Sequence, residues 1–371
     1  MSVPLVYPPL VYLLIRMLRI GFRGLGKGDG LRPSAPIPFL AFACLFLVAF
    51  RVSLNIADSG VIDVGYAGVI GAERITHGEP IYGEGAFPDD NPTGDTYGPA
   101  NYYAYVPFET VLPWSGEWDA LPAAHAAAIF FDLATVFGLF VLGGRLWPGD
   151  RRAGRAAGVV LAFAWLAYPY TAFALQSNSN DSLVAALLIW GLVFFSSPVA
   201  RGGLIAAAAM AKFAPLALVP LYVVGERGLV DRMEGWRPRW VALRPVALAA
   251  AVLVITSVVL LAHPAIDPGL ATFWERTGES QLDRESPFSV WGQVDGLGWL
   301  QALLLAGASV LAVVVALVPR RRDLAQATAL AAAVLVASQL AVDHWFYLYV
   351  PWAVGLLFVA LAPARAAAAR G

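Results

Sequence analysis

Apolar residues along this chain form a series of long segments, each close to 20 residues, separated by shorter polar stretches. The segments span residues 37–56, 122–144, 156–175, 182–199, 203–224, 241–262, 298–318, 324–342 and 345–362. A helix needs about 20 apolar residues to cross about 30 Å of hydrocarbon. The pattern therefore predicts an all-α polytopic membrane protein.

One segment, 203–224, is interrupted at its centre by Lys212-Phe213-Ala214-Pro215. Proline removes a helical hydrogen bond, and a lysine at mid-bilayer depth is costly unless it faces protein or water. We therefore expect a re-entrant helix pair that rises to about Lys212 and returns to the side it came from. The alternative is a straight helix whose lysine extends toward the interface. With the re-entrant pair, the remaining segments give eight full crossings within one domain, residues 36–371.

The distribution of charges orients these segments. Hydrophobic residues make up 59% of the chain and charged residues 14%, while the net charge of −1 hides a strong segregation. Arginines gather in the connections 145–155, 226–244 and 320–322, which the positive-inside rule places in the cytoplasm. Most acidic residues fall in two long connections on the opposite side, 57–121 and 263–297. We expect a multi-pass cell-membrane protein, in contact with membrane lipids, whose active site faces the extracytoplasmic side.

The N-terminal stretch has a different pattern. Residues 3–15 are apolar, but Arg16 and Arg19 interrupt the run before it reaches spanning length. The charges follow the apolar stretch, which is not the order of a signal peptide. We expect residues 1–35 to form an interfacial helix and a cytoplasmic linker rich in glycine and proline. The alternative is the tail of an upstream crossing, with an incomplete N-terminus.

Several kinds of chemistry lack their usual motifs. Cys44 is the one cysteine, so no intrachain disulfide or zinc cluster can form, and His77, His125, His263 and His344 show no metal-ligand spacing. The sequence contains neither a phosphate-binding P-loop nor the glycine-rich motif of dinucleotide sites. We therefore expect no cofactor and no nucleic-acid partner.

The first external segment is too long to be a simple connector, and such loops are usually functional. Apolar residues recur at helical spacing from Val61 to His77, which predicts a helix on the membrane face with Asp63 in its first turn. A turn-rich stretch and an aromatic run, Tyr102–Glu109, follow. Such aromatic residues are typical of membrane anchors. Interleaved with carboxylates, they also suit a sugar-binding cleft.

Five short motifs follow one another in order along residues 58–352. They are Asp63–Tyr82, which ends in Gly78-Glu-Pro-Ile-Tyr82; Tyr97-Gly98-Pro99 with Tyr105-Val106-Pro107; Gln176–Asp181; Ala211–Pro215; and Asp343-His344-Trp345-Phe346-Tyr347. This set resembles GT-C glycosyltransferases and, more closely, glycosyltransferase family 87, the polyprenyl-phosphate-mannose-dependent mannosyltransferase-like proteins. The sequence departs from the family at Gly98, where a proline is usual, and in an acidic insertion at 84–95.

The resemblance implies a GT-C-like helical bundle with a long first external loop that carries membrane-surface helices. It also implies a reaction, the inverting transfer of a sugar, of mannose type, from a polyprenyl-phosphate donor to an envelope lipid or glycan acceptor. Such a transfer needs one carboxylate to deprotonate the acceptor hydroxyl. Asp63 is the predicted base. Its alternative role is that of a carboxylate that stabilises a helix N-terminus.

The remaining candidates concern substrate binding, and each has a structural alternative. Lys212 is expected to neutralise the donor phosphate, or to pair with Asp132 or Asp181. His344 is expected to hydrogen-bond the same phosphate, or to cap a helix. Arg276 and Arg284 are further candidates for phosphate, or partners of Glu275, Glu279 or Asp283. The other candidate substrate-binding residues are Asn178, Asn180, Asp181, Asp95 and Tyr97.

The Asn178–Asp181 turn has the alternative role of a helix cap. Asp95 has the alternative role of a second carboxylate or a metal ligand. The resemblance implies a family that need not use a metal, so no metal is predicted. Two other functions stay open. A lipid or solute transporter or flippase would also contain a broken helix and an intramembrane lysine. A noncatalytic scaffold for envelope assembly would explain the acidic face but not the positions of Lys212 and His344.

Overall fold

The computed structural model describes residues 6–26, 30, 33, 35–234, 239–280 and 288–362, and this described part is helical, without a strand. The helices in chain order are α1 (Tyr7–Arg23), α2 (Ile37–Ala57), α3 (Asp63–His77), α4 (Pro99–Val111), α5 (Pro122–Leu146), α6 (Arg151–Leu166), α7 (Pro169–Gln176), α8 (Asp181–Val193), α9 (Pro198–Ala211), η2 (Ala214–Leu218), α10 (Val219–Val224), α11 (Leu229–Glu234), α12 (Arg239–Ile266), α13 (Leu270–Trp274), η3 (Glu275–Glu279), α15 (Gly298–Leu317), α16 (Leu324–Ala341), η4 (Tyr347–Tyr349) and α17 (Val350–Leu361).

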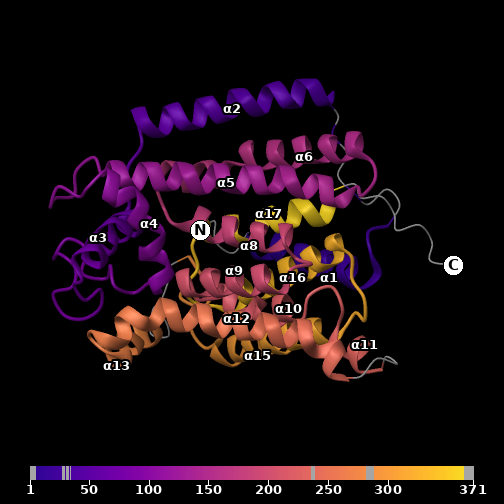
Figure 1. The fold of residues 1–371 in the computed structure, drawn as a ribbon. Coiled ribbons are helices and arrows are strands. Elements are labelled where there is room, and N and C mark those ends of the chain that lie inside the picture. The colour runs from indigo at the N-terminus through magenta and orange to yellow at the C-terminus, as the bar shows by residue number, and fades with distance from the viewer. Residues whose placement is uncertain are drawn as a thin grey trace.

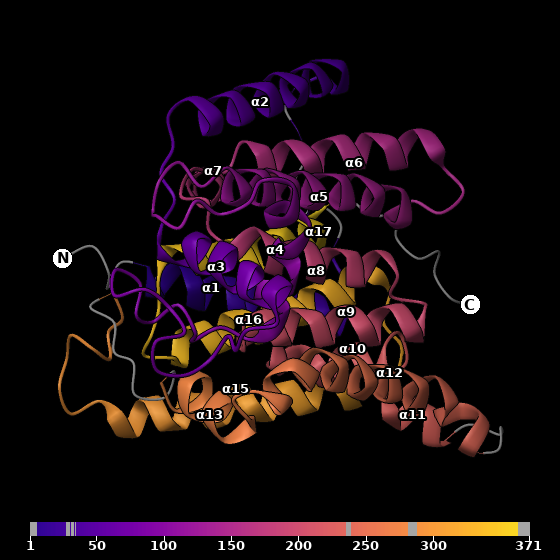
Figure 2. The same ribbon diagram turned by 60° about the vertical axis from the view of Figure 1, so that its left-hand side comes forward.

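The long helices run side by side in layers, with α2 along one edge, α5 and α6 next to it, and α12 and α15 along the opposite edge (Figures 1 and 2). Helix α16 lies in the centre. Of its 18 residues, 83% are buried, whereas only 11% and 6% are buried in the most apolar 18-residue stretches of α2 and α12. The outer helices therefore present apolar side chains such as Phe42 and Val258 outward. Outward-facing apolar side chains are what a hydrocarbon surrounding favours. The chain is a multi-pass membrane protein.

Fewer helices reach spanning length than the eight crossings that hydropathy predicts. Within the described residues, five helices are long and apolar enough, or six if the bent pair α6 and α7 counts as one span. The predicted crossing at 182–199 is a helix of only 13 residues, α8, the crossing at 345–362 contains the 12-residue α17, and the crossing at 156–175 bends by 61°. The bend lies at Pro169, which begins a new helix, and Pro351 lies in the first turn of α17. A count of apolar residues does not detect such breaks.

The predicted re-entrant pair is present. Helix α9 ends at Ala211, and after Lys212 the chain returns as η2 and α10. The Arg201 guanidinium, near the start of α9, donates to the Val223 carbonyl near the end of α10 over 3.3 Å. The two outer ends of the pair therefore meet, and Lys212 stands at its tip. With 14 residues, α9 is about 21 Å long, which is shorter than a bilayer core.

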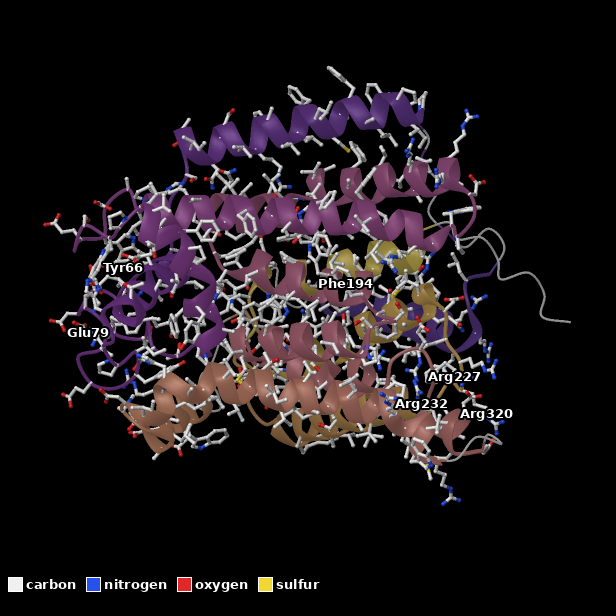
Figure 3. All side chains as sticks on the ribbon, viewed as in Figure 1. Tyr66, Glu79, Phe194, Arg227, Arg232 and Arg320 are labelled. Carbon is white, nitrogen blue, oxygen red and sulfur yellow. The ribbon has the colours of Figure 1, made fainter. Side chains whose placement is uncertain are left out.

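Opposite charges occupy opposite ends of the molecule, as the sequence predicts. Glu79 lies at one end and Arg227, Arg232 and Arg320 at the other (Figure 3). At the basic end, the backbone N–H of Gly228 donates to the Arg320 carbonyl over 2.8 Å. The connections 225–228 and 318–323 thus lie together, as the positive-inside rule requires of one side.

The N-terminal helix corrects one expectation. Helix α1 packs along α16, with Met17 0% and Ile20 3% exposed. A side chain at Gly21 would collide with Leu330 of α16, so the two helices approach closely. The segment predicted to lie on the membrane surface is therefore part of the helical bundle. Periodicity missed this because Arg16 and Arg19 shorten the apolar run, although they leave one apolar face intact.

Candidate functional site

A cavity of about 820 Å³ opens where α3, α4 and α8 begin and where the re-entrant pair turns. One part of its wall is polar and is formed by Asp63, Tyr97, Asp181, Lys212, Asp343 and His344. The other part is apolar and comes from α10, α15 and α16, through residues such as Pro220, Leu305 and Leu335. The fold therefore brings five of the predicted site residues together in one place, and Asp343 with them.

Lys212 forms the centre of the polar wall. It follows α9 in an extended conformation and has 9% of its side chain exposed. Its ammonium Nζ donates to Asp181 Oδ1 over 2.6 Å, and the Asp181 side chain is 1% exposed. The pairing with Asp181 is thus present, whereas the alternative partner, Asp132, binds Arg51 instead.

Aromatic rings surround the Lys212 ammonium. The nitrogen lies 5.7 Å from the ring centre of Tyr97, 5.3 Å from that of Tyr349 and 5.2 Å from that of Trp352. Ring faces attract a cation at such distances. The indole N–H of Trp352 also donates to Asp181 Oδ1 over 2.8 Å. We call Tyr97, Tyr349 and Trp352 the aromatic cage.

A glycine allows Tyr97 to reach this cage. A Cβ atom at Gly98 would collide with the backbone carbonyl of Met210, near the end of α9. The start of α4 can therefore approach the tip of the re-entrant pair only without a side chain at this position. Gly98 is the residue at which the sequence departs from its resemblance, and the close packing gives a physical reason for it.

Asp63 is the first residue of α3, as predicted, and its half-buried side chain lines the cavity. The backbone around it is held from two directions. The N–H of Ile62 donates to the Ser177 carbonyl over 3.1 Å, and the Asn91 amide donates to the Asp63 carbonyl over 2.9 Å. Asp63 Oδ1 accepts from the Val64 N–H at 2.9 Å. This local bond fits a helix N-terminus as well as a catalytic carboxylate.

The two predicted sugar-binding asparagines lie outside the described cavity lining. Asn178 adopts a left-handed φ of 49°, and its amide donates to Ser59 Oγ and the Gly60 carbonyl. Its side-chain oxygen accepts from Asn55 over 2.8 Å. Asn180 donates to Asn101 Oδ1 over 2.7 Å. Both residues therefore position the turn before α8, and through it Asp181 and the start of α3.

Asp95 and Arg276 also lie outside the cavity lining. The Arg276 guanidinium donates to both oxygens of Asp95, over 2.6 Å and 2.9 Å, and this hydrogen bonding raises the pKa of Arg276. Asp95 Oδ2 also accepts from the Gly83 N–H. The pair joins the connections 57–121 and 263–297, so Arg276 binds an acid distant in the sequence, where the expected structural alternative was one of the nearby acids. Arg284 lies outside the described residues.

His344 lines the cavity, and its ring packs 4.7 Å from that of Phe346. Its neighbour Asp343 lines the cavity too and accepts from Ser289 Oγ over 2.9 Å. Asp343, Tyr349 and Trp352 also line the cavity, but the sequence did not predict a role for them. Asp343 belongs to a motif and could have been proposed on that ground. Tyr349 and Trp352 lie outside every motif, so the sequence gives no sign of their position. Within the described residues, no three His, Cys, Asp or Glu side chains gather as metal ligands would, and the prediction that no metal takes part stays a prediction.

Comparisons with known proteins point in one direction. The sequence model of glycosyltransferase family 87 matches residues 96–342, a range that includes Lys212 but neither Asp63 nor His344. No curated protein matches the sequence. The fold is similar to the crystal structure of ArnT from Cupriavidus metallidurans bound to undecaprenyl phosphate, with a TM-score of 0.57 and 20% identity. The match covers 88% of this chain and 59% of that one. The likeness confirms the GT-C-like helical fold.

Proposed function

Because the chain belongs to glycosyltransferase family 87, we propose that it transfers a sugar from a polyprenyl-phosphate donor to a lipid or glycan acceptor. The main support for this proposal is the cavity, in which the buried Lys212 lies beside an apolar wall formed by α10, α15 and α16. A polyprenyl phosphate has the same two parts, an anionic head and an apolar chain. The similar structure of ArnT is bound to undecaprenyl phosphate, which supports the same class of ligand.

Lys212 is the proposed phosphate-binding group. A cation with little access to water interacts more strongly with phosphate than an exposed one does. The apolar wall formed by α10, α15 and α16 would hold the first isoprene units of the donor. His344 lines the same cavity and would add a hydrogen bond to the phosphate or its sugar.

Asp63 is the proposed general base. In an inverting transfer, the acceptor hydroxyl attacks the anomeric carbon and gives its proton to the Asp63 carboxylate. The bond between that carbon and the phosphate oxygen breaks, and its electron pair leaves on the phosphate. The Lys212 ammonium stabilises this negative charge. The reaction needs no cofactor and no metal, so chelation with EDTA should leave the rate unchanged.

The sugar is proposed to be mannose, from the resemblance to mannosyltransferase-like proteins, and the acceptor an envelope lipid or glycan. The acidic end, which includes Asp63 of the cavity wall, is proposed to face the extracytoplasmic side because arginines occupy the other end. Cysteine labelling tests this orientation in a Cys44→Ala background. Ser115→Cys should react with an impermeant reagent added to intact cells, and Met233→Cys should not. Equal labelling of both would contradict the orientation.

The direct test of function is transfer by the purified protein in lipid nanodiscs. The donors are labelled undecaprenyl-phosphate mannose and undecaprenyl-phosphate glucose, and the acceptors are extracted envelope lipids and glycans. We expect label to move from donor to acceptor with wild type and not with Asp63→Asn. If neither donor is consumed while proteoliposomes move the lipid or its sugar across the bilayer, the protein is a transporter or flippase. If neither occurs, a scaffold role takes its place.

A further inference from the structure

The carboxylate of Asp181 is bonded unevenly. Its Oδ1 accepts from both Lys212 Nζ and Trp352 Nε1, over 2.6 Å and 2.8 Å. Its Oδ2 is buried and has no hydrogen-bond partner within the described residues. Leaving a buried charged oxygen without a donor is costly, and native structures seldom do so without a reason.

Unused hydrogen-bond donors lie on the segments that adjoin this carboxylate. The hydroxyls of Tyr105 and Ser182 and the amide nitrogen of Asn101 are buried and likewise lack partners in the described part of the chain. Ser182 is the next residue in the chain, and Tyr105 belongs to the same buried cluster as Leu183 and Ala211, which are the chain neighbours of Ser182 and Lys212. Asn101 lies one turn before Tyr105 on α4 and is bonded to Asn180. The described structure thus places three unpaired donors on segments next to Asp181.

We propose that Asp181 is a positioning residue that exchanges its partner during the reaction. Without ligand, it neutralises the Lys212 ammonium. When a polyprenyl phosphate enters, the phosphate takes the ammonium, and the Asp181 carboxylate turns to Tyr105, Ser182 and Asn101. The proposal rests on the assignment of Lys212 to the donor phosphate.

The surroundings of Lys212 suit such an exchange. The aromatic cage attracts the ammonium through three ring faces, whichever anion it binds. Lys212 and Asp181 both line the cavity, so a phosphate can approach the ammonium while the carboxylate is still close. The carboxylate then repels the phosphate. This repulsion limits the affinity for the spent polyprenyl phosphate and so lets the product leave.

The exchange predicts opposite effects for two nearly isosteric variants. Asp181→Asn removes the competing charge, so it should bind undecaprenyl phosphate about tenfold more tightly than wild type. Its kcat and KM for the donor should fall together, because the product leaves slowly. Tyr105→Phe removes a hydroxyl that is unpaired in the ligand-free protein, so its melting temperature should not fall. It should bind undecaprenyl phosphate about fivefold more weakly, since the displaced carboxylate loses one donor.

The matched control is Asp132→Asn. Asp132 is also buried, also paired with a cation and also bonded to an indole N–H, but it does not line the cavity. We expect this variant to melt at a lower temperature and to keep the wild-type affinity.

The experiment measures the Kd of undecaprenyl phosphate, with undecaprenol as the uncharged control, for protein in nanodiscs. Tighter binding by Asp181→Asn and weaker binding by Tyr105→Phe support the exchange. Binding by folded Asp181→Asn that equals or is weaker than wild type overturns it, as does wild-type affinity in Tyr105→Phe or an equal gain in Asp132→Asn. If Asp181→Asn does not fold, Tyr105→Phe decides. If Lys212→Met keeps the wild-type affinity, both the exchange and the proposed phosphate site are wrong. If Lys212→Met loses affinity while Asp181→Asn and Tyr105→Phe bind like wild type, the phosphate site is supported and the exchange is wrong.

Discussion

Two buried ion pairs in this protein each combine a cation, an aspartate and an indole N–H, and they differ in the cation and in access to the cavity. In one, Arg51 of α2 lies 3.0 Å from Asp132 Oδ1, which also accepts from the indole N–H of Trp165. In the other, Lys212 lies 2.6 Å from Asp181 Oδ1, which also accepts from the indole N–H of Trp352. We call them the sealed pair and the cavity pair.

The sealed pair is tied to the backbone. Arg51 donates to the carbonyls of Leu166 and Thr171, over 2.9 Å and 2.8 Å, at the bend between α6 and α7. Arginine offers five donors in a rigid fork and keeps its charge, so the pair fixes α2 against this bend. Among the described residues, the Lys212 ammonium donates one hydrogen bond, to Asp181. A cation held by one side chain and by ring faces can change partners. The sealed pair therefore stabilises the fold, whereas the cavity pair can bind a ligand.

The largest effect expected on activity comes from the cavity side of this comparison. Asp63→Asn keeps the size of the side chain and removes the proposed base, so transfer should fall by about 10²–10⁴-fold. Donor affinity and melting temperature should stay close to wild type. Asp58→Asn, Glu73→Gln and Asp95→Asn are the controls, because none of these residues lines the cavity. Full transfer by Asp63→Asn together with loss in Asp58→Asn or Asp95→Asn would mean that the base is misassigned.

The sealed pair should affect stability instead. Arg51→Met leaves Asp132 charged and buried without its cation, which typically costs about 3–5 kcal/mol. We expect a marked fall in the apparent melting temperature, measured in detergent, while the remaining folded protein binds undecaprenyl phosphate normally. A variant with wild-type stability and impaired binding would remove the distinction between the two pairs.

The cavity pair should affect donor binding. Lys212→Met should raise the donor KM or Kd about 10- to 100-fold, the range for losing one hydrogen bond to a charged group. His344→Ala should act in the same direction but more weakly. Titrations with undecaprenyl phosphate measure both. If both variants turn over normally, the phosphate is held elsewhere, and Arg276 is the next candidate.

The smallest effect on donor binding is expected for the pair between Arg276 and Asp95. Its aspartate side chain is 1% exposed and its arginine 36%, and neither residue lines the cavity. Arg276→Met should change donor affinity by less than about fivefold. Hydrogen exchange in residues 270–280 should become faster, because the pair joins the connections 57–121 and 263–297. A larger loss of donor binding than in Lys212→Met would place the phosphate at this pair.

The sequence predicts the helical class, the segregation of charge and the turn at Lys212, because each depends on local composition. It does not predict the other breaks in the apolar segments. Pro169 begins a new helix inside the segment 156–175, and the helix of the segment 182–199 ends at Val193, before Pro198 begins α9. The sequence also predicts, wrongly, that α1 lies on the membrane surface. Arg16 and Arg19 shorten its apolar run, although one face of the helix remains apolar and packs on α16.

The site was predictable only in part, for a related reason. Asp63, Lys212 and His344 occur in short motifs, and the fold brings them to one cavity. Asn178 also belongs to a motif, and Arg276 is one of few cations in its connection. However, Asn178 already binds the Gly60 carbonyl and Arg276 already binds Asp95. Trp352 and Tyr349 belong to an ordinary apolar helix start. Their contact with Lys212 depends on how α17 lies beside α8, which no local pattern encodes.

The most direct test of the central claim is a structure of the protein with undecaprenyl phosphate in a nanodisc. The account predicts the phosphate within about 3 Å of Lys212 Nζ, a hydrogen-bond distance, and the prenyl chain against α10, α15 and α16. In that complex, Asp181 should have left Lys212 for Tyr105, Ser182 and Asn101. A phosphate bound at Arg276, with the 2.6 Å contact between Lys212 and Asp181 unchanged, would contradict it.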